Sequence, residues 1–387
     1  MSVSNPTTLP SPDGRTRLSL LVDDSVRQLN ICNACRYCEG ACAVFPALSR
    51  RTVLDAGDIS QLANLCHDCR ACYDACMYTA PHEFDLNIPA VLTAVRLEDY
   101  RRYVWPARVP RLLRGWTGIF AGAVLSAALM VGIAAANAGW PAIVAVHDGG
   151  ASPYVLVPDP VLVGLMLAAA AYSAVIGALA ARRFWTASGG SGVEVHPGAV
   201  LKAAWYALTL RYLRGGGTDC YYPEDEVPSP ARRYLHILVV SGFGLCIVST
   251  LAAAVLQDII GSQPPYAWLS VPVISGAVGG IGLIAGCAGL LLLKARSSQV
   301  TGIAQMNVKD YGLLTALTFL ALSGLAVLLT RSTAAFGCVL LIHLAAVILA
   351  FASAPYSKFV HAVFRFTALV RDNAERMTQE RTRSAAG

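Results

Sequence analysis

Six long apolar segments are the feature that most constrains this sequence. They cover roughly residues 116–138, 160–181, 235–257, 271–293, 311–330 and 335–354. Each is long and apolar enough to cross about 30 Å of hydrocarbon as an α-helix, although the last two are near the short limit. Only 14% of the residues are charged and 55% are hydrophobic, whereas about 25% are charged in a typical soluble domain. The sequence therefore predicts an all-α membrane protein with a bundle of six transmembrane helices.

Lysine and arginine are distributed unevenly among the loops of this predicted bundle. Basic residues precede the first segment, fill the stretch 182–233 and follow the fourth segment, whereas the loops 139–159 and 258–270 contain none. Basic loops remain on the cytoplasmic side of a membrane, so both chain termini are expected in the cytoplasm. The net charge of +6 is explained by these flanks, with membrane lipid as the expected contact and no nucleic acid as a partner.

The same pattern divides the chain into parts. Residues 1–25 are expected to form a flexible tail, since the first twenty are rich in Pro, Ser and Thr and have no apolar core. Residues 26–105 are expected to form a cytoplasmic domain, and residues 106–371 the membrane domain, with 182–233 as a cytoplasmic insertion. Residues 372–387 are expected to form a cytoplasmic tail.

Eight of the twelve cysteines lie in two runs, CNACRYCEGAC (32–42) and CHDCRACYDAC (66–76). Both runs have the spacing C-x2-C-x2-C-x3-C, and each cysteine of the second follows its counterpart by 34 positions. In two-cluster ferredoxins the fourth cysteine of each run binds the cluster of the other run. The repeat predicts two [4Fe-4S] clusters in a helical ferredoxin-like domain. The ligands would be Cys32, Cys35, Cys38 and Cys76 for one cluster, and Cys66, Cys69, Cys72 and Cys42 for the other.

Structural zinc is the alternative for these cysteines, and a zinc-stapled membrane anchor or redox sensor is the corresponding function. Zinc sites normally separate two C-x2-C pairs by a longer span, which a triple run suits poorly. One departure from small ferredoxins is visible, because Ala43 and Met77 stand where proline usually follows the fourth cysteine. His67 lies among the second set of ligands, and we expect it to be solvated or hydrogen-bonded rather than a ligand.

Three histidines lie in or at the ends of the apolar segments, where ionisable residues are costly and often functional. His343 and His361 are eighteen residues apart, which is five turns or about 27 Å along a continuous helix, so they cannot serve one small site. Pro355 should kink or break the helix between them. His361 and His236 are both expected at the cytoplasmic boundary, where two imidazoles from different helices could hold a b-type haem.

The surroundings of this predicted haem are less constrained by the sequence. Its propionates could meet Arg232, Arg233 and Lys358, because these cations lie near the same boundary. His343 lies deeper and lacks a histidine partner, since Cys246 occupies the matching depth of the third segment and His147 is poorly placed. The sequence favours one haem, with a second still open. His343 is then either an alternative ligand to His361 or a hydrogen-bonding core residue, and boundary histidines that only meet lipid headgroups remain an alternative.

Glycines at 279–286, GGIGLIAG, lie inside the fourth apolar segment and do not follow a strand. They are therefore expected to allow close helix packing rather than to bind a dinucleotide. This chain is expected to bind neither FAD nor NAD.

Seven segments together resemble the TcuB/CitB family, the tricarballylate- or citrate-utilisation protein B. They are ICNACRYCEGACAVFPA (31–47), LANLCHDCRACYDAC (62–76), PHEFDLNIPAVL (81–92), LTLRYLRGGGTDCYYP (208–223), ARRYLH (231–236), PVISGAVGGIGLIAG (272–286) and PYSKFVHAVFRF (355–366). The resemblance covers nearly the whole chain after about residue 25. The last membrane helix also resembles the haem-binding helix of the nitrate reductase gamma subunit, although Cys246 replaces that subunit's other deep histidine.

The resemblance implies a role as the electron-transfer subunit of an oxidoreductase complex in the bacterial cytoplasmic (inner) membrane. Such a subunit reoxidises a separate FAD-dependent dehydrogenase acting on tricarballylate and passes electrons through iron–sulfur clusters and haem to quinone. It has no catalytic residues of its own. A related flavohaem protein works in cobalamin synthesis, so a relay serving a flavoprotein of that pathway is the alternative.

Overall fold

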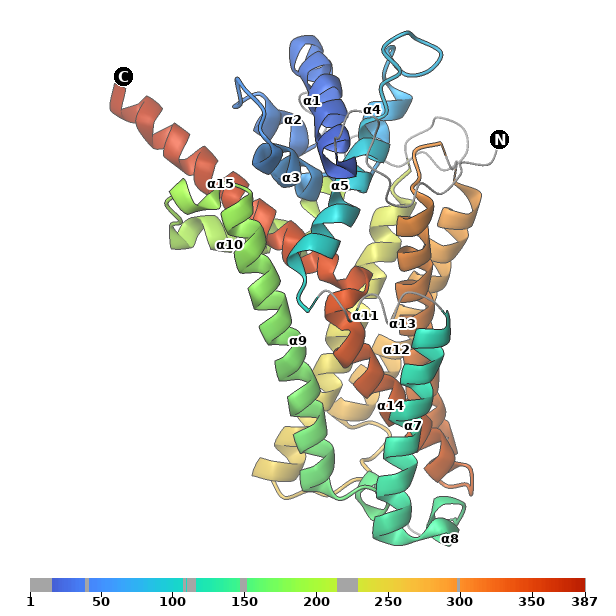
Figure 1. The fold of residues 1–387 in the computed structure, drawn as a ribbon. Coiled ribbons are helices and arrows are strands. Elements are labelled where there is room, and N and C mark those ends of the chain that lie inside the picture. Colours follow the sequence, from blue (N-terminus) through green and yellow to red (C-terminus); the bar gives the residue numbers. More distant parts are fainter. Residues whose placement is uncertain are drawn as a thin grey trace.

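The computed structural model describes residues 16–38, 42–106, 109, 116–146, 152–213, 229–297 and 300–386. The regular structure within these ranges consists of helices, and none of the described residues forms a β-strand. A small domain of five helices, α1 to α5, sits at one end of a bundle of long helices (Figure 1). The fold is therefore all-α, as predicted.

Six helices have the length and composition needed to cross a membrane. They are α7 (Trp116–Ala138), α9 (Asp159–Ala187), α11 (Ala231–Ala254, extended by a π-helical turn, Val255–Ile259), α12 (Val271–Arg296), α13 (Ala304–Thr330) and α14 (Phe336–Ser353). The six predicted segments are thus confirmed, and the chain has the make-up of a multi-pass membrane protein. Short helices join or flank them: α8 (Trp140–Ile143), η1 (Pro153–Val155), η2 (Gly190–Gly192), η5 (Ala354–Tyr356) and η6 (Lys358–Val360).

Helix α13 begins earlier than the apolar pattern indicates. Its first turns carry polar residues, and protein groups pair with them: Lys309 donates to the carbonyl of Tyr356, and Asp310 forms ion pairs with Lys294 and Lys358. Because these groups are satisfied within the protein, the helix extends past the part that apolar composition alone would place in lipid.

The bundle is built by neighbouring helices in chain order. Helix α11 packs on α12, α12 on α13, α13 on α14, and α14 contacts both α7 and α9. The α11–α12 contact is close: a Cβ on Gly242 would lie 2.7 Å from the carbonyl oxygen of Gly279, and one on Gly286 would lie 2.8 Å from that of Leu235. The prediction that the glycines of this segment serve helix packing is confirmed.

The small domain consists of α1 (Arg17–Cys35), α2 (Val44–Leu48), α3 (Ala56–Leu65), α4 (Ala71–Asp74) and α5 (Ile88–Tyr103). Asp55 and Asp58 form a capping box at the start of α3, and Asn87 caps α5 through the backbone N–H of Ala90. Its core includes Leu29, Ile59, Leu62, Leu65 and Leu92, all fully buried. These helices hold the two cysteine runs in place.

Residues 17–25 were expected in a flexible tail, and this expectation is wrong. Helix α1 begins at Arg17 because the Thr16 side chain accepts a hydrogen bond from the N–H of Ser19 and caps the helix. Helix α1 then packs on α5, and Ser25 on it is fully buried.

Residues 372–387 were expected to form a cytoplasmic tail, but residues 372–386 are helical. Helix α15 (His361–Ala386) packs against α3, α9 and α10 (Pro197–Leu208). The ring of Phe364 on α15 packs at a tilt against the rings of Tyr100 and Phe184, at centroid distances of 5.0 and 5.2 Å respectively. Further along, Asp372 pairs with Arg50 of the loop after α2. Residues 372–386 therefore belong to a helix that joins the membrane bundle to the small domain (Figure 1).

Candidate functional site

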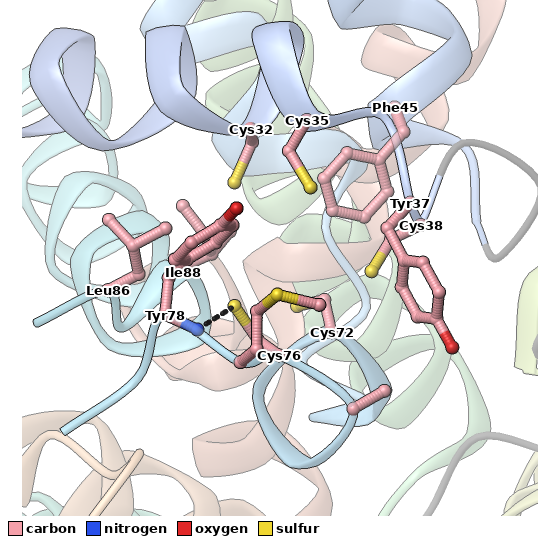
Figure 2. Close-up of a pocket in the computed structure, with 12 residues that line it drawn as sticks. Cys32, Cys35, Tyr37, Cys38, Phe45, Cys72, Cys76, Tyr78, Leu86 and Ile88 are labelled. Atoms are coloured by element: carbon pink, nitrogen blue, oxygen red, sulfur yellow. Dashed lines mark hydrogen bonds between the residues drawn. The ribbon is translucent and has the colours of Figure 1, made fainter. Parts of the chain in front are cut away.

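Two adjoining cavities in the small domain are lined by the eight clustered cysteines. The first is lined by Cys32, Cys35, Cys38, Cys72 and Cys76 (Figure 2). The second is lined by Cys42, Cys66, Cys69 and Cys72. Each cavity thus includes three cysteines of one run and the fourth of the other run, and Cys72 lines both cavities. The division of the eight cysteines between two clusters stays a prediction.

The local backbone explains how the thiols come to face the cavities. Arg36 ends α1 in the left-handed region, at φ 55°, and its N–H bonds the carbonyl of Cys32. Asp68 and Arg70, at φ 53° and 67°, turn the chain between the cysteines of the second run. Residues with a Cβ seldom adopt this conformation, and it concentrates at functional sites. The strained turns allow closely spaced cysteines to converge instead of following one helix.

Three backbone N–H groups point at cysteine sulfurs. In each case the donor is two residues after the cysteine and the N···Sγ distance is 3.4 Å. The pairs are Val44 with Cys42, Asp68 with Cys66, and Tyr78 with Cys76, the last of which is drawn in Figure 2. Donors of this kind stabilise negative charge on sulfur and help to set the potential of an iron–sulfur cluster.

The buried thiols resist ionisation on their own. Burial raises the pKa of Cys32 to about 12, and neighbouring cysteines add to the shift. Burial likewise raises the pKa of Cys42, Cys66 and Cys72. Iron is bound by thiolates, so cluster binding would supply the missing positive charge and release these protons. The donor set and its surroundings fit such clusters.

The two cavities differ in their exposure. At the first, Cys35 is exposed, and the lining residues Tyr37 and Met77 are 72% and 67% exposed. At the second, Cys66 and Cys69 are only 8% and 9% exposed. The first cavity therefore has exposed residues in its lining, whereas the described lining residues of the second are buried or half-buried.

Three arginines from distant parts of the chain converge on the backbone of the second run. Arg96 of α5 and Arg365 of α15 both donate to the carbonyl oxygen of Cys66, the latter at 2.8 Å. Arg232 of α11 donates to the carbonyls of the next two residues, His67 and Asp68, at 3.0 and 2.5 Å. The loop at the second cavity is thus held from three helices at once.

Two of these arginines are four residues from the predicted haem ligands. Arg232 precedes His236 on α11, and Arg365 follows His361 on α15. Residues four apart lie on one face of a helix. His236 and His361 therefore lie on the helix faces that are bonded to the cysteine loop, one turn away from it.

The hydrogen bonding of His361 suits a metal ligand. Its Nδ1 lies 2.5 Å from the carbonyl oxygen of Lys358, which only an N–H can meet, so Nε2 keeps its lone pair. Burial lowers the pKa of His361 to about 3, and the charges of Arg365, Lys358 and His236 act in the same direction. The imidazole of His361 is thus neutral.

His343 is in a different place. Helix α14 ends at Ser353, and η5 and η6 separate it from α15, as expected from Pro355. The Nδ1 of His343 lies 2.9 Å from the Oγ of Ser323 on α13, and its ring packs against Gly324. His343 is therefore a hydrogen-bonded residue between α13 and α14.

Comparison with known proteins identifies the family. The family model described as Citrate utilization protein B matches residues 117–383, and the one described as Citrate utilization protein B Fer4-like domain matches residues 25–102. The chain belongs to the citrate utilization protein B family. A relative named Citrate utilization protein B, from Escherichia coli, is 38% identical over 350 residues, which cover 89% of this chain and 90% of that protein. No solved structure matches the chain.

Membership of the citrate utilization protein B family confirms the resemblance seen in the motifs. Its Fer4-like domain model covers both cysteine runs, which indicates an iron–sulfur domain and is consistent with electron transfer. The two cavities lie in this domain, and the three candidate haem histidines lie in the part matched by the other model.

The structure gives two of the three predicted propionate partners other contacts. Lys358 forms an ion pair with Asp310 at 2.9 Å, and Arg232 bonds the cysteine loop. The Nε of Arg233 is buried and has no hydrogen-bond partner among the described residues. The assignment of these residues to the haem propionates stays a prediction. Of the three, Arg233 has an N–H group, at Nε, that is available to bond a propionate.

Sequence reasoning missed several features of this family's site. Arg96 and Arg365 were not singled out, although the position of Arg365 one turn after His361 was a usable signal. His67 was expected to be solvated or hydrogen-bonded rather than a ligand; it is only 9% exposed and therefore not solvated, it hydrogen-bonds the backbone of Leu65, and its ring lies 5.8 Å from that of Tyr212. His147 and the isolated Cys220 lie outside the described residues.

Proposed function

We propose that this chain is a membrane electron-transfer subunit that takes electrons from a separate flavin-dependent dehydrogenase and delivers them to quinone. Two [4Fe-4S] clusters in the cysteine-lined cavities and a haem b near the cytoplasmic boundary would serve as carriers. The observation that carries the proposal is the position of the eight cysteines: each cavity includes three of one run and the fourth of the other, and Cys72 lines both cavities. That grouping is typical of proteins with two clusters.

The cavities support clusters over the zinc alternative. The thiols surround two adjoining spaces with sulfur donors on several sides, as a polynuclear cluster needs. Bound there, each cluster would supply a one-electron carrier, and the protein would contribute the ligands and the N–H groups aimed at sulfur.

His236 and His361 are the proposed axial ligands of the haem, with His343 as the alternative to His361. The Lys358 carbonyl orients the His361 ring and leaves Nε2 for iron. Arg232 and Arg365 connect the two histidine-bearing helices to the backbone of the second cavity. A haem held here would therefore have its edge near the buried cavity, which is what a relay requires.

The partner and acceptor follow from the family rather than from contacts in this chain. The relative's name refers to citrate utilization, which supports a tricarboxylate such as tricarballylate as the dehydrogenase substrate over a role in cobalamin synthesis. The small domain lies at the same end of the bundle as the basic loops, which supports cytoplasmic termini in the bacterial inner membrane. A quinone in the lipid phase is the acceptor that a membrane-embedded haem can reach.

The test is spectroscopy of the full chain purified without oxygen in detergent, after expression with iron and haem supplied. We expect about eight non-haem iron atoms and eight acid-labile sulfides per chain, two cluster signals in electron paramagnetic resonance, and a reducible b-type haem spectrum from one further iron. About two zinc ions without labile sulfide would instead establish the zinc-stapled anchor. A colourless protein would refute the relay.

A further inference from the structure

The two cavities differ in charge as well as in exposure, and this difference bears on the direction of electron flow. We infer that Arg96, Arg232 and Arg365 make the second cavity the place where an added electron is more stable, so that electrons enter at the first cavity and leave from the second. This inference rests on the proposed function and refines it by assigning an order to the two sites.

The cationic groups are concentrated at one cavity. Three guanidinium groups bond the carbonyls of residues 66–68, and each comes from a different helix. A fourth cation, Arg70, lines the second cavity and is only 8% exposed. The carboxylate of Asp68 lies in the same loop and opposes them in part. Buried cations near a cluster favour its reduced form, because reduction adds one negative charge.

The lining of the first cavity contains no arginine or lysine among the described residues. The described residues that line it are cysteines with Tyr37, Phe45, Ala75, Met77, Tyr78, Leu86 and Ile88, none of which carries a fixed charge. Water at the exposed rim of this cavity is the main group available there to stabilise the negative charge that reduction adds. Burial alone would disfavour added negative charge at the second cavity, so the arginines must outweigh that penalty for electrons to collect there.

The exposures fit the same order. Electron tunnelling falls steeply with distance, so a protein donor must reach a cluster whose edge is near the surface. Among the described residues, exposed side chains such as Tyr37 and Met77 line the first cavity around an exposed cysteine, and none of the exposed residues lines the second. The loop of the second cavity is bonded to the helices of His236 and His361. One electron at a time would leave the reduced flavin of the partner, occupy the first site and then the second, with no bond made or broken.

The test compares midpoint potentials of the two clusters in the full chain, measured by redox titration with paramagnetic resonance. Arg365→Gln removes one buried cation, Arg365→Lys keeps the charge, and Arg101→Gln neutralises a partly exposed arginine on the same helix as Arg96. Cys69→Ser identifies the second cluster, because Cys69 lines the second cavity and not the first. No partner protein is needed for these measurements.

We expect Arg365→Gln to lower the potential of the second cluster enough to change electron sharing between the clusters about tenfold, or about 59 mV for one electron. The first cluster should keep its potential, and Arg365→Lys and Arg101→Gln should shift neither cluster by that amount. The inference is overturned if Arg365→Gln shifts both potentials together or shifts neither. It is also overturned if Arg365→Lys lowers the potential of the second cluster as much as Arg365→Gln does. An unmodified chain without any cluster signal would instead refute the proposed function itself.

Discussion

Arg365 donates a 2.8 Å hydrogen bond to the carbonyl oxygen of Cys66 and stands four residues after His361 on the same helix. Arg232 repeats the arrangement on α11, where it bonds the carbonyls of His67 and Asp68 and precedes His236 by four residues. Both proposed haem ligands are therefore one helical turn from an arginine that is bonded to the same short loop. This relationship makes the histidine assignment testable.

His361→Ala should remove the haem spectrum and leave the clusters, because the loop of the second cavity keeps Arg365 and its other contacts. His343→Ala, on the neighbouring helix, is the matched comparison and should keep the haem. The measurement is haem absorbance relative to cluster iron in the purified chain. Haem lost from the His343 variant but retained in the His361 variant would transfer the ligand role to His343.

Cys42→Ser should disturb the cluster held by Cys66, Cys69 and Cys72, although Cys42 lies in the other run. Loss of one cluster would lower the iron content by about half. The control is Cys246→Ser, because Cys246 lies on α11 away from both cavities. Iron analysis and paramagnetic resonance distinguish the outcomes, and loss of the first cluster instead would show that each run binds its own cluster.

Gly242→Ala should destabilise the bundle, because its Cβ would lie 2.7 Å from backbone atoms of α12. Overpacking of this kind costs about 1–3 kcal/mol. Gly244→Ala lies on the same helix with nothing within 4 Å of the added Cβ, so it should be neutral or slightly stabilising. Thermal unfolding in detergent, followed by circular dichroism, would measure the difference. Equal melting temperatures in the two variants would contradict the close contact.

Asp99→Asn should remove a pH dependence from the stability of the small domain. Burial raises the pKa of Asp99 from 3.8 to about 7, so between these values the folded chain holds a proton that the unfolded chain releases. This contribution is complete below about pH 4 and is lost as the pH rises through 7, with an upper limit of roughly 4 kcal/mol. The amide can still accept from Ser60 and Asn64, which bond one oxygen of Asp99 at 2.8 and 2.7 Å.

The measurement is the change in melting temperature of this variant between pH 6 and pH 8. Wild type should lose stability over that range more steeply than Asp99→Asn. Glu98→Gln, at the neighbouring and more exposed carboxylate, serves as control and should follow wild type. Parallel curves for wild type and Asp99→Asn would mean that Asp99 is ionised at both pH values.

Asp372→Asn should loosen helix α15 from the small domain. The Asp372 side chain is only 2% exposed and pairs with Arg50 and Arg376, and removing one partner of a buried ion pair costs up to about 3–5 kcal/mol. Glu380→Gln, on the exposed end of the same helix, should change little. Limited proteolysis of the C-terminal segment and thermal unfolding would both report the effect, and equal protease resistance in the two variants would refute it.

The sequence was most informative where a local pattern determines structure. Apolar length located the six spans, and Pro355 located the end of α14. The 34-residue repeat grouped the cysteines into two sets, and the members of each set line one cavity, with Cys72 lining both. The contacts of Arg96 and Arg365 could not be predicted from the sequence, because a hydrogen bond to a backbone carbonyl far along the chain requires no recognisable sequence motif. The helical start at Arg17 and the polar first turns of α13 were missed for a related reason: their stability comes from a cap and from packing partners rather than from composition.

Helix α15 has a mechanical consequence for the proposed electron transfer. It begins with His361 at the bundle, and its later turns are fixed to the small domain through Asp372 with Arg50 and Glu375 with Arg51. The distance between the second cavity and His361 is therefore fixed by a rigid helix and not by a flexible linker. Electron transfer across that distance should then be insensitive to solvent viscosity, and only the encounter with the partner should slow in glycerol.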